Sequence, residues 1–188
     1  MRSDIRFKVI SAAVFLFLVL AGGLPLLKHR NYRVPIVLGP GVTSVVPLSE
    51  FSPGLKGTGA DTNVYVLEGS EPGGKVILFG GTHANEAEGT LSAILFIENA
   101  VVEKGTVYVI PFFNRSGSRN TKPGDGYPLY FSIKTPWGAR EFRMGNRDAS
   151  PLEQWPDPDV YIHYPERQLL SYIDIRNINR TWPGRARG

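Results

Sequence analysis

The sequence contains no cysteine, and its 188 residues include only three histidines. The lack of cysteine excludes disulfide bonds, thiolate metal ligands and a cysteine nucleophile, although it does not decide the redox compartment. Low-complexity composition is also absent, because glycine (21) and proline (15) together make up about 19% of the chain, below the roughly 25–30% of disordered sequences. The 42% hydrophobic and 20% charged residues are ordinary for a globular protein, and the length fits one domain.

Most of the chain lacks an excess of positive charge. Residues 1–33 hold six basic residues and one acidic residue, whereas residues 34–188 hold 15 basic and 16 acidic residues. The net charge of +4 therefore comes from the N-terminus. Eight arginines between Arg140 and Arg187 are interleaved with acidic residues, which indicates a solvated face with a few anion-binding arginines. A nucleic-acid surface, which needs a concentrated basic face on the folded domain, is not indicated.

A long apolar run occurs at the N-terminus. The basic segment Met1–Lys8 precedes Val9–Leu20, in which Ser11 is the one polar residue, and the apolar stretch can be extended to Leu27 to give 19 residues. Small residues at 21–23 suit a signal-peptidase site, while 19 residues approach the ~20 needed to span a bilayer. We therefore predict that residues 1–30 are a secretory signal peptide or an uncleaved membrane anchor, rather than a buried core helix. Either role places the rest of the chain outside the cytoplasm, secreted or anchored.

The order of a predicted strand, helix and strand indicates a βαβ unit in the middle of the chain. Thr62–Leu67 has the β-branched and aromatic content of a strand, and Lys75–Phe79 is apolar throughout after its lysine, as in a strand buried on both faces. Helical spacing follows over Glu86–Ala100, and Thr106–Phe113 predicts the next strand. Strand, crossover helix and strand within about 40 residues are typical of a parallel pair.

The flanking segments carry weaker patterns. Residues 28–60 are rich in proline and glycine and predict a lead-in with short strands at Val34–Leu38 and Val42–Val46. Residues 114–160 show no periodicity and predict a long functional surface loop, while Pro165–Ile175 suggests a helix. We predict an α/β domain over residues 31–188, with a mixed, largely parallel sheet flanked by helices on both faces and incomplete on its C-terminal side.

The segment between the strand and the crossover helix carries the residues best suited to chemistry. His83 and Glu86 lie three residues apart at the carboxyl end of the predicted strand, where open α/β sheets bind ligands. An imidazole and a carboxylate are two of the three ligands of a catalytic zinc site, in which the metal polarises a carbonyl and acidifies a water molecule. Spacing alone leaves a second interpretation, a hydrogen-bonded histidine beside a helix-capping carboxylate. Glu88 is expected to face solvent.

Three elements in order resemble one enzyme family. Residues 79–89, FGGTHANEAEG, are similar to the His-Gly-Asn-Glu-x-x-Gly motif of the succinylglutamate desuccinylase/aspartoacylase family, a branch of the zinc metallocarboxypeptidase superfamily. Residues 177–184, NINRTWPG, resemble the family's Asp-Leu-Asn-Arg-x-Phe-Pro-Gly element, and residues 109–114, VIPFFN, stand where the family has a strand ending in Pro-x-x-Asn. The resemblance covers roughly residues 62–184, the N-terminal part of such an enzyme.

This resemblance implies a zinc-carboxypeptidase-like fold and a site. His83 and Glu86 would be the first two zinc ligands, and Asn179 and Arg180 would bind a substrate carboxylate, for which a planar guanidinium is suited. Without the motif, the alternative for Arg180 is a structural ion pair or a solvated arginine. The implied activity is zinc-dependent hydrolysis of an amide bond in a carboxylate-bearing substrate, as in an N-acyl amino acid deacylase. The alternatives are a peptide or cell-wall carboxypeptidase and an inactive, membrane-tethered carboxylate-binding module.

The sequence departs from the family pattern in three places. Asn177 replaces the family's Asp, and the arginine that the deacylases place some residues earlier is missing, with Arg140, Arg143, Arg147 and Arg176 as its candidate substitutes. The third ligand and the general-base Glu follow the Asn-Arg element in the superfamily, so both are expected to lie outside the 188 residues. We therefore expect a fragment or a truncated relative that is inactive by itself. His163 stands in the wrong order for the third ligand and is expected to be an exposed loop residue.

Overall fold

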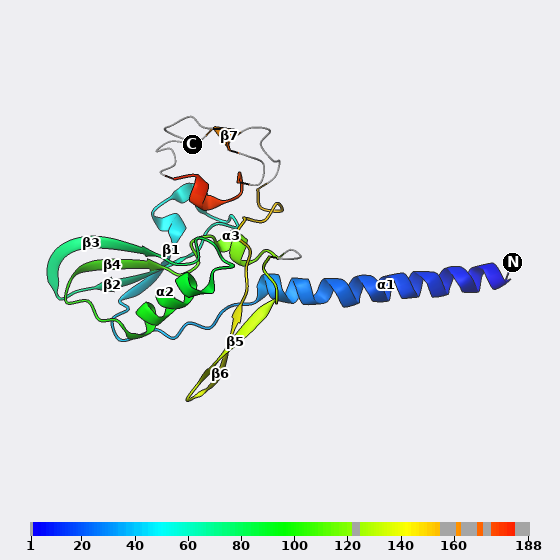
Figure 1. Ribbon diagram of the computed structural model, residues 1–188, viewed down its shortest axis with the longest axis horizontal. Coiled ribbons are helices and arrows are strands. Elements are labelled where there is room, and N and C mark those ends of the chain that lie inside the picture. Colours follow the sequence, from blue (N-terminus) through cyan, green and yellow to red (C-terminus); the bar gives the residue numbers. More distant parts are fainter. Residues whose placement is uncertain (1, 122–124, 155–160, 163–168, 171–173, 183–188) are drawn as a thin grey trace. The chain divides into compact units, whose positions relative to one another are not determined.

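The computed structural model describes residues 2–121, 125–154, 161–162, 169–170 and 174–182. The chain divides into two compact units, residues 1–33 and residues 34–188. The first unit consists of helix α1 (Arg2–Asn31), and the second contains all of the strands. Figure 1 shows the elements in the colours of the sequence.

Helix α1 continues through two glycines and a proline. Gly22, Gly23 and Pro25 all lie inside the helix. Among the described residues it is the helix long and apolar enough to cross a membrane: an 18-residue window within Asp4–Asn31 reaches a mean hydropathy of 2.4. At 1.5 Å per residue, these 28 residues extend over about 42 Å, more than the ~30 Å hydrocarbon core of a bilayer. Signal peptides have the same features, so the structure supports a signal or an anchor without separating the two.

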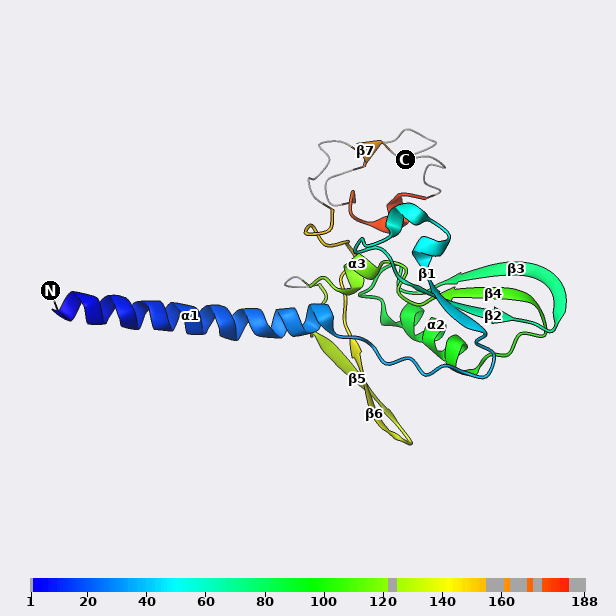
Figure 2. The same ribbon diagram turned by 180° about the vertical axis from the view of Figure 1, so that it is seen from behind.

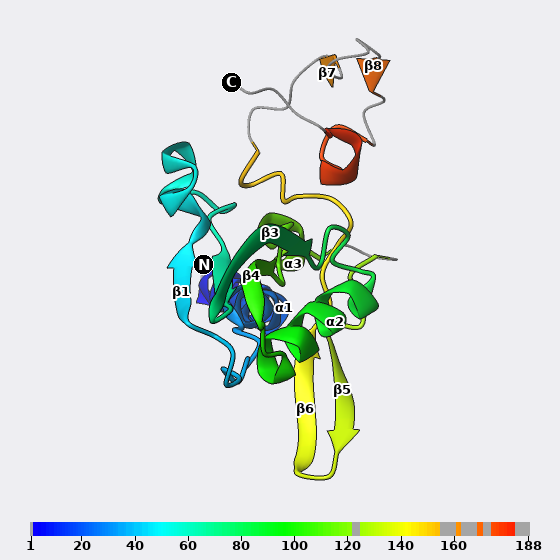
Figure 3. The ribbon, with the colours of Figure 1, turned by 90° about the vertical axis from the view of Figure 1, so that its left-hand side faces the viewer.

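A four-stranded mixed sheet forms the centre of the second unit. Its strands are β1 (Ser44–Pro47), β2 (Asn63–Glu68), β3 (Glu71–Phe79) and β4 (Lys104–Ile110), in the spatial order β1-β2-β4-β3. Figure 3 labels β1, β4 and β3 of this sheet. The β1–β2 and β2–β4 pairs are antiparallel, and β3–β4 is parallel. The α/β class and the mixed sheet are thus confirmed. The expectation of a largely parallel sheet is wrong for these strands, because β2 runs antiparallel to both of its neighbours.

The predicted βαβ unit is present. Helix α2 (Ala87–Asn99) connects β3 to the parallel neighbour β4, and its boundaries lie within one residue of the prediction. Ala93 and Ile97 of the helix pack with Leu67 and Val109 of the sheet, all at most 1% exposed. The apolar face of α2 therefore covers the middle of the sheet and forms the core.

Strand β3 corrects one prediction about burial. It lies at the edge of the sheet, with β4 on one side, and its residues are exposed from Glu71 to Ile77. Val76 and Ile77 are 58% and 56% exposed, although they alternate between the two faces. A continuous apolar run is typical of a strand covered on both faces, but the described residues cover neither face here. The strand also begins four residues earlier than predicted, at Glu71.

The remaining segments contain short elements. Helix α3 (Arg115–Ser118) and the hairpin of β5 (Tyr130–Thr135) and β6 (Gly138–Arg143) occupy the region expected to be an irregular loop. Short 3-10 turns η1 (Leu48–Glu50), η2 (Pro53–Leu55) and η3 (Ile178–Arg180) and a small pair, β7 (Tyr161–Ile162) and β8 (Leu169–Leu170), complete the description.

Two of the weaker sequence expectations fail. Val34–Leu38 is not a strand, whereas Val42–Val46 overlaps β1. Of the helix expected at Pro165–Ile175, the structure describes residues 169–170, which are strand β8, and residues 174–175, which are in a turn; the others lie outside the described residues.

An ion pair connects helix α2, the β5–β6 hairpin and the segment that precedes β1. Arg140 of β6 donates to both carboxylate oxygens of Glu98, at 2.7 and 2.8 Å, and also to the carbonyl oxygen of Pro35 at 3.0 Å. The backbone N–H of Val37 donates to the same carboxylate at 3.0 Å. The Glu98 side chain is only 10% exposed. The hydrogen bonds from Arg140 lower the pKa of the Glu98 carboxyl below its ordinary value, and the same bonds raise the pKa of Arg140.

Candidate functional site

Two glycines shape the turn that presents the candidate ligands. Gly80 donates to the carbonyl of Ile110 at 2.8 Å, and the carbonyl of Gly80 accepts from Phe113 at 2.9 Å, so the backbones after β3 and β4 remain paired beyond the strand ends. Gly81 has φ +64°, and a Cβ there would lie 2.7 Å from the hydroxyl oxygen of Thr90. Glycine is therefore required at this position both for its backbone conformation and for its lack of a side chain.

The stabilities of Gly81→Ala and of the same replacement at a nearby glycine test whether glycine is required at position 81. We expect Gly81→Ala to lower the free energy of unfolding by about 2 kcal/mol, because alanine is strained at positive φ and crowds Thr90. The matched change is Gly89→Ala in α2, where a Cβ meets nothing closer than 3.5 Å. It should raise stability by about 0.5–1 kcal/mol, because alanine favours a helix. Urea unfolding of the full chain in detergent measures both, and equal shifts in one direction would contradict the assigned turn.

The structure brings the two predicted ligands together. Nδ1 of His83 lies 2.9 Å from Oε1 of Glu86, and the side chains are 12% and 47% exposed. Glu86 stands at the N-cap position of α2, yet its side chain makes no capping hydrogen bond. The capping part of the second interpretation is therefore wrong, whereas its hydrogen-bonded histidine is present, with the carboxylate directed at the imidazole. Glu88 is exposed, as expected.

A buried asparagine fixes the tautomer of His83. Nε2 of His83 lies 3.0 Å from Oδ1 of Asn177, whose side chain is buried. The backbone N–H of Asn179 donates to the same atom at 3.1 Å, so that atom must be the amide oxygen. Nε2 therefore carries a proton and donates it to Asn177.

The fixed tautomer has a consequence on the other side of the ring. Nδ1 of His83 faces a carboxylate oxygen of Glu86, which only accepts hydrogen bonds. Two lone pairs at this distance repel each other unless a cation stands between them. A hydrogen bond with the proton between the two atoms satisfies this contact, and a metal ion bound by both atoms would satisfy it too. The sequence marked Asn177 only as a departure from the family pattern, although its position two residues before Asn179 could have suggested its role.

Of the four arginines considered from the sequence, Arg147 lies at this site. Its Nη2 is 3.3 Å from Oε1 of Glu86, and both side chains are 47% exposed. The side-chain amide of Asn114 donates to the carbonyl oxygen of Arg147 at 3.0 Å and holds its backbone in place. Arg140 is instead in the ion pair with α2, and Arg143 donates to a serine of α3. The carbonyl oxygen of Arg176 accepts from the backbone N–H of Ala149 at 3.0 Å. The Arg147 guanidinium thus lies beside a candidate ligand.

The two residues predicted to bind a substrate carboxylate lie on η3, directly after Asn177. Asn179 and Arg180 are exposed. Nε of Arg180 lies 3.5 Å from Oδ1 of Asp174, and the two side chains are 54% and 33% exposed. Arg180 therefore has the ion pair that the alternative interpretation expected, in a half-exposed position from which the guanidinium still reaches solvent.

An aromatic cluster anchors this segment to the sheet. The ring of Trp182 lies 5.6 Å from that of Phe79 and 5.7 Å from that of Phe113, and the two phenylalanine rings are 4.4 Å apart. Phe79 ends β3, and Phe113 follows β4. The cluster therefore holds the Asn177–Trp182 segment at the strand ends that precede His83.

The donor set fits a metal only in part. His83 and Glu86 supply one nitrogen and one oxygen at a common point, but the described residues contain no group of three or more His, Cys, Asp or Glu side chains that could hold a metal ion. His163, the replacement ligand weighed from the sequence, lies outside the described residues.

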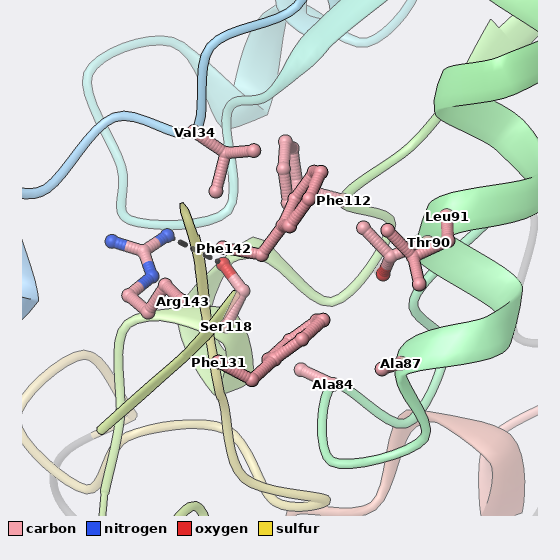
Figure 4. Close-up of a pocket in the computed structure, with 10 residues that line it drawn as sticks. All are labelled: Val34, Ala84, Ala87, Thr90, Leu91, Phe112, Ser118, Phe131, Phe142 and Arg143. Atoms are coloured by element: carbon pink, nitrogen blue, oxygen red, sulfur yellow. Dashed lines mark hydrogen bonds between the residues drawn. The ribbon is translucent and has the colours of Figure 1, made fainter. Parts of the chain in front are cut away.

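A small cavity lies on the inner side of the same turn. Figure 4 shows Ala84 and Ala87 facing Phe112, Phe131 and Phe142, with Arg143 and its hydrogen bond to Ser118 at one end. Its volume of about 10 Å³ has room for roughly one water molecule. The cavity is therefore part of the packing that supports the turn, and too small to be a substrate pocket.

Comparison of the chain with protein-family models, with curated proteins and with solved structures found no match. The resemblance described from the sequence therefore depends on its three motifs.

Proposed function

We propose that this protein is a zinc-dependent hydrolase that cleaves an amide bond in a substrate with a free carboxylate. One observation carries the proposal: Nδ1 of His83 and Oε1 of Glu86 lie 2.9 Å apart, while Asn177 occupies the proton on the other ring nitrogen. With its Nε2–H donated to Asn177, His83 would use Nδ1 to ligate a metal beside the carboxylate of Glu86, as metal-binding histidines with an outer-shell partner do. His83 and Glu86 would be two ligands, and the third is not assigned.

The residues around the pair supply binding and orientation. When bound, zinc provides Lewis-acid polarisation of a carbonyl group and activation of water for attack. Asn177 keeps the imidazole in one tautomer and one orientation. Arg147 and Arg180 carry half-exposed guanidinium groups, which bind carboxylates through two parallel hydrogen bonds. Asn179 is exposed beside Arg180 and can donate to the same group.

A non-enzymatic function has its own support. Arg147 already lies 3.3 Å from Glu86, and this ion pair competes with a metal for the carboxylate. Together with the two-residue donor set, it favours a membrane-tethered module that binds a carboxylate without zinc. The two functions differ in one measurable property, the dependence of ligand binding on the metal.

The affinity for an N-acyl amino acid, measured once with zinc and once with a chelator, distinguishes the hydrolase from the binding module. The full chain in detergent is titrated with N-succinyl and N-acetyl amino acids, and amino acid release is followed in the same samples. The hydrolase proposal expects tighter binding with zinc, and Arg147→Ala should weaken it by about tenfold. Equal affinity in both conditions without release would establish the binding module instead. Binding and amino acid release with peptides that have a free C-terminus, and neither with N-acyl amino acids, would favour the carboxypeptidase alternative.

A further inference from the structure

The β5–β6 hairpin carries the most exposed tryptophan among the described residues. The hairpin projects from the four-stranded sheet in both views (Figures 1 and 2), and Trp137 at its tip is 92% exposed. A large aromatic side chain left fully in water is unusual in a soluble surface, because tryptophan is highly buried on average. We therefore looked for a binding partner for this side chain outside the described residues.

Hydrogen bonds within the turn hold Trp137 in this position. The hydroxyl of Thr135 donates to the carbonyl oxygen of Gly138 at 2.6 Å and accepts from the backbone N–H of Trp137 at 3.3 Å. Gly138 has φ +120°, a conformation that favours glycine. These features close the turn tightly, so Trp137 is presented by a defined turn rather than by a loose loop.

The tip has the composition of a membrane-interface segment. Residues 132–139, SIKTPWGA, contain one charged side chain, Lys134, next to the exposed Ile133 and Pro136. Tryptophan is enriched at the boundary between lipid and water, because its ring is apolar while its N–H still finds a partner. A lysine beside it is attracted to anionic headgroups.

The hairpin is bonded to the chain just after the apolar helix. Arg140 donates to the carbonyl oxygen of Pro35 at 3.0 Å, and Pro35 follows the last residue of α1, Asn31, by only four residues. Trp137 is three residues from Arg140, about 10 Å along a strand. One hydrogen bond and a short strand therefore link the tip to the segment that follows α1 in the sequence.

From these observations we infer that the tip of the β5–β6 hairpin is a second membrane contact, in which Trp137 inserts into the interface of an anionic bilayer beside Lys134. The inference rests on α1 being held in the membrane and is independent of the zinc site. The hairpin fixes the orientation of the second unit with respect to the lipid surface, because a single helix anchor followed by a short linker leaves that orientation free.

Tryptophan emission in vesicles tests this contact. The variant Trp155→Phe/Trp182→Phe keeps Trp137 as the single reporter, and the full chain is reconstituted in phosphatidylcholine and phosphatidylglycerol vesicles with acyl chains brominated near the headgroup. Trp137 should emit at shorter wavelength and lose about half or more of its intensity relative to unbrominated lipid, as expected for an interfacial ring. Subtracting the emission spectrum of Trp137→Phe from that of the wild type also isolates the emission of Trp137, and it needs only this one surface substitution.

A tryptophan elsewhere on the surface is the control. Leu152 is 80% exposed, and Leu152→Trp in a chain with its other tryptophans replaced by phenylalanine should be quenched by aqueous acrylamide and not by brominated lipid. Acrylamide quenching of Trp137 without lipid quenching would overturn the inference. Protection of Trp137 from both quenchers, increasing with the protein-to-lipid ratio, would also overturn it, because it would identify a second copy of the chain as the partner.

Discussion

The replacement His83→Ala is expected to lower the zinc affinity of the full chain by more than about a hundredfold, more than the 10–100-fold cost of losing an outer-shell partner. His83 supplies the one nitrogen of the candidate pair, and its Nδ1 is 2.9 Å from Glu86. Without the imidazole, the carboxylate remains next to Arg147 at 3.3 Å, an arrangement that favours an ion pair over a metal. Titration of zinc into the protein in detergent, followed by calorimetry, measures the change.

The neighbouring carboxylate is the matched control for this experiment. Glu88 is exposed and lies two residues after Glu86, so Glu88→Gln should leave zinc binding within about twofold of the wild type. Glu86→Gln should behave like His83→Ala. Retention of wild-type zinc affinity in His83→Ala would refute the ligand assignment, and equal losses in Glu86→Gln and Glu88→Gln would show a nonspecific charge effect.

The second large effect is expected from the ion pair of Glu98. Glu98→Ala should lower the free energy of unfolding by about 2–3 kcal/mol, less than the roughly 3–5 kcal/mol cost of breaking a fully buried pair, because Arg140 is 27% exposed. The change leaves Arg140 without its carboxylate and removes the acceptor of the Val37 N–H. Glu103→Ala, at an exposed position, should shift stability by less than about 0.5 kcal/mol. Urea unfolding in detergent compares the two, and a similar small shift in both would contradict the role of the pair.

The same ion pair gives a defined dependence on pH. Because the hydrogen bonds of Arg140 lower the pKa of Glu98 in the folded protein, its ionised form stabilises the fold. This contribution is fully present above the ordinary carboxyl pKa and is lost as pH falls through the lowered folded pKa. The stability difference between the wild type and Glu98→Gln should therefore be large at neutral pH and shrink in acid, where both side chains are uncharged. A difference that stays constant would exclude this origin.

The βαβ unit and the site turn could be predicted because their signals are local. Helical spacing of the apolar residues places α2 within one residue, and the two glycines before His83 are typical of a tight turn, in which Gly81 has φ +64°. The pairing of His83 with Glu86 follows from three-residue spacing across that turn. Each of these features depends on residues close together in the sequence.

The features that could not be predicted depend on distant contacts. An apolar strand has the same sequence pattern at the centre of a sheet as at its edge, so the pattern could not predict that β3 is exposed. The β5–β6 hairpin has polar residues on both faces, which hides its alternation. Asn177 meets His83 across 94 residues, and Arg147 meets Glu86 across 61, so no local pattern distinguishes them.

X-ray absorption at the zinc edge of the loaded full chain tests the central claim most directly, because it reports the atoms around the metal. The account predicts scattering from one imidazole ring together with oxygen neighbours in the wild type, and loss of the imidazole signal in His83→Ala. Identical spectra from the two proteins, or a wild-type spectrum with oxygen neighbours alone, would contradict the claim that His83 and Glu86 together hold a metal ion.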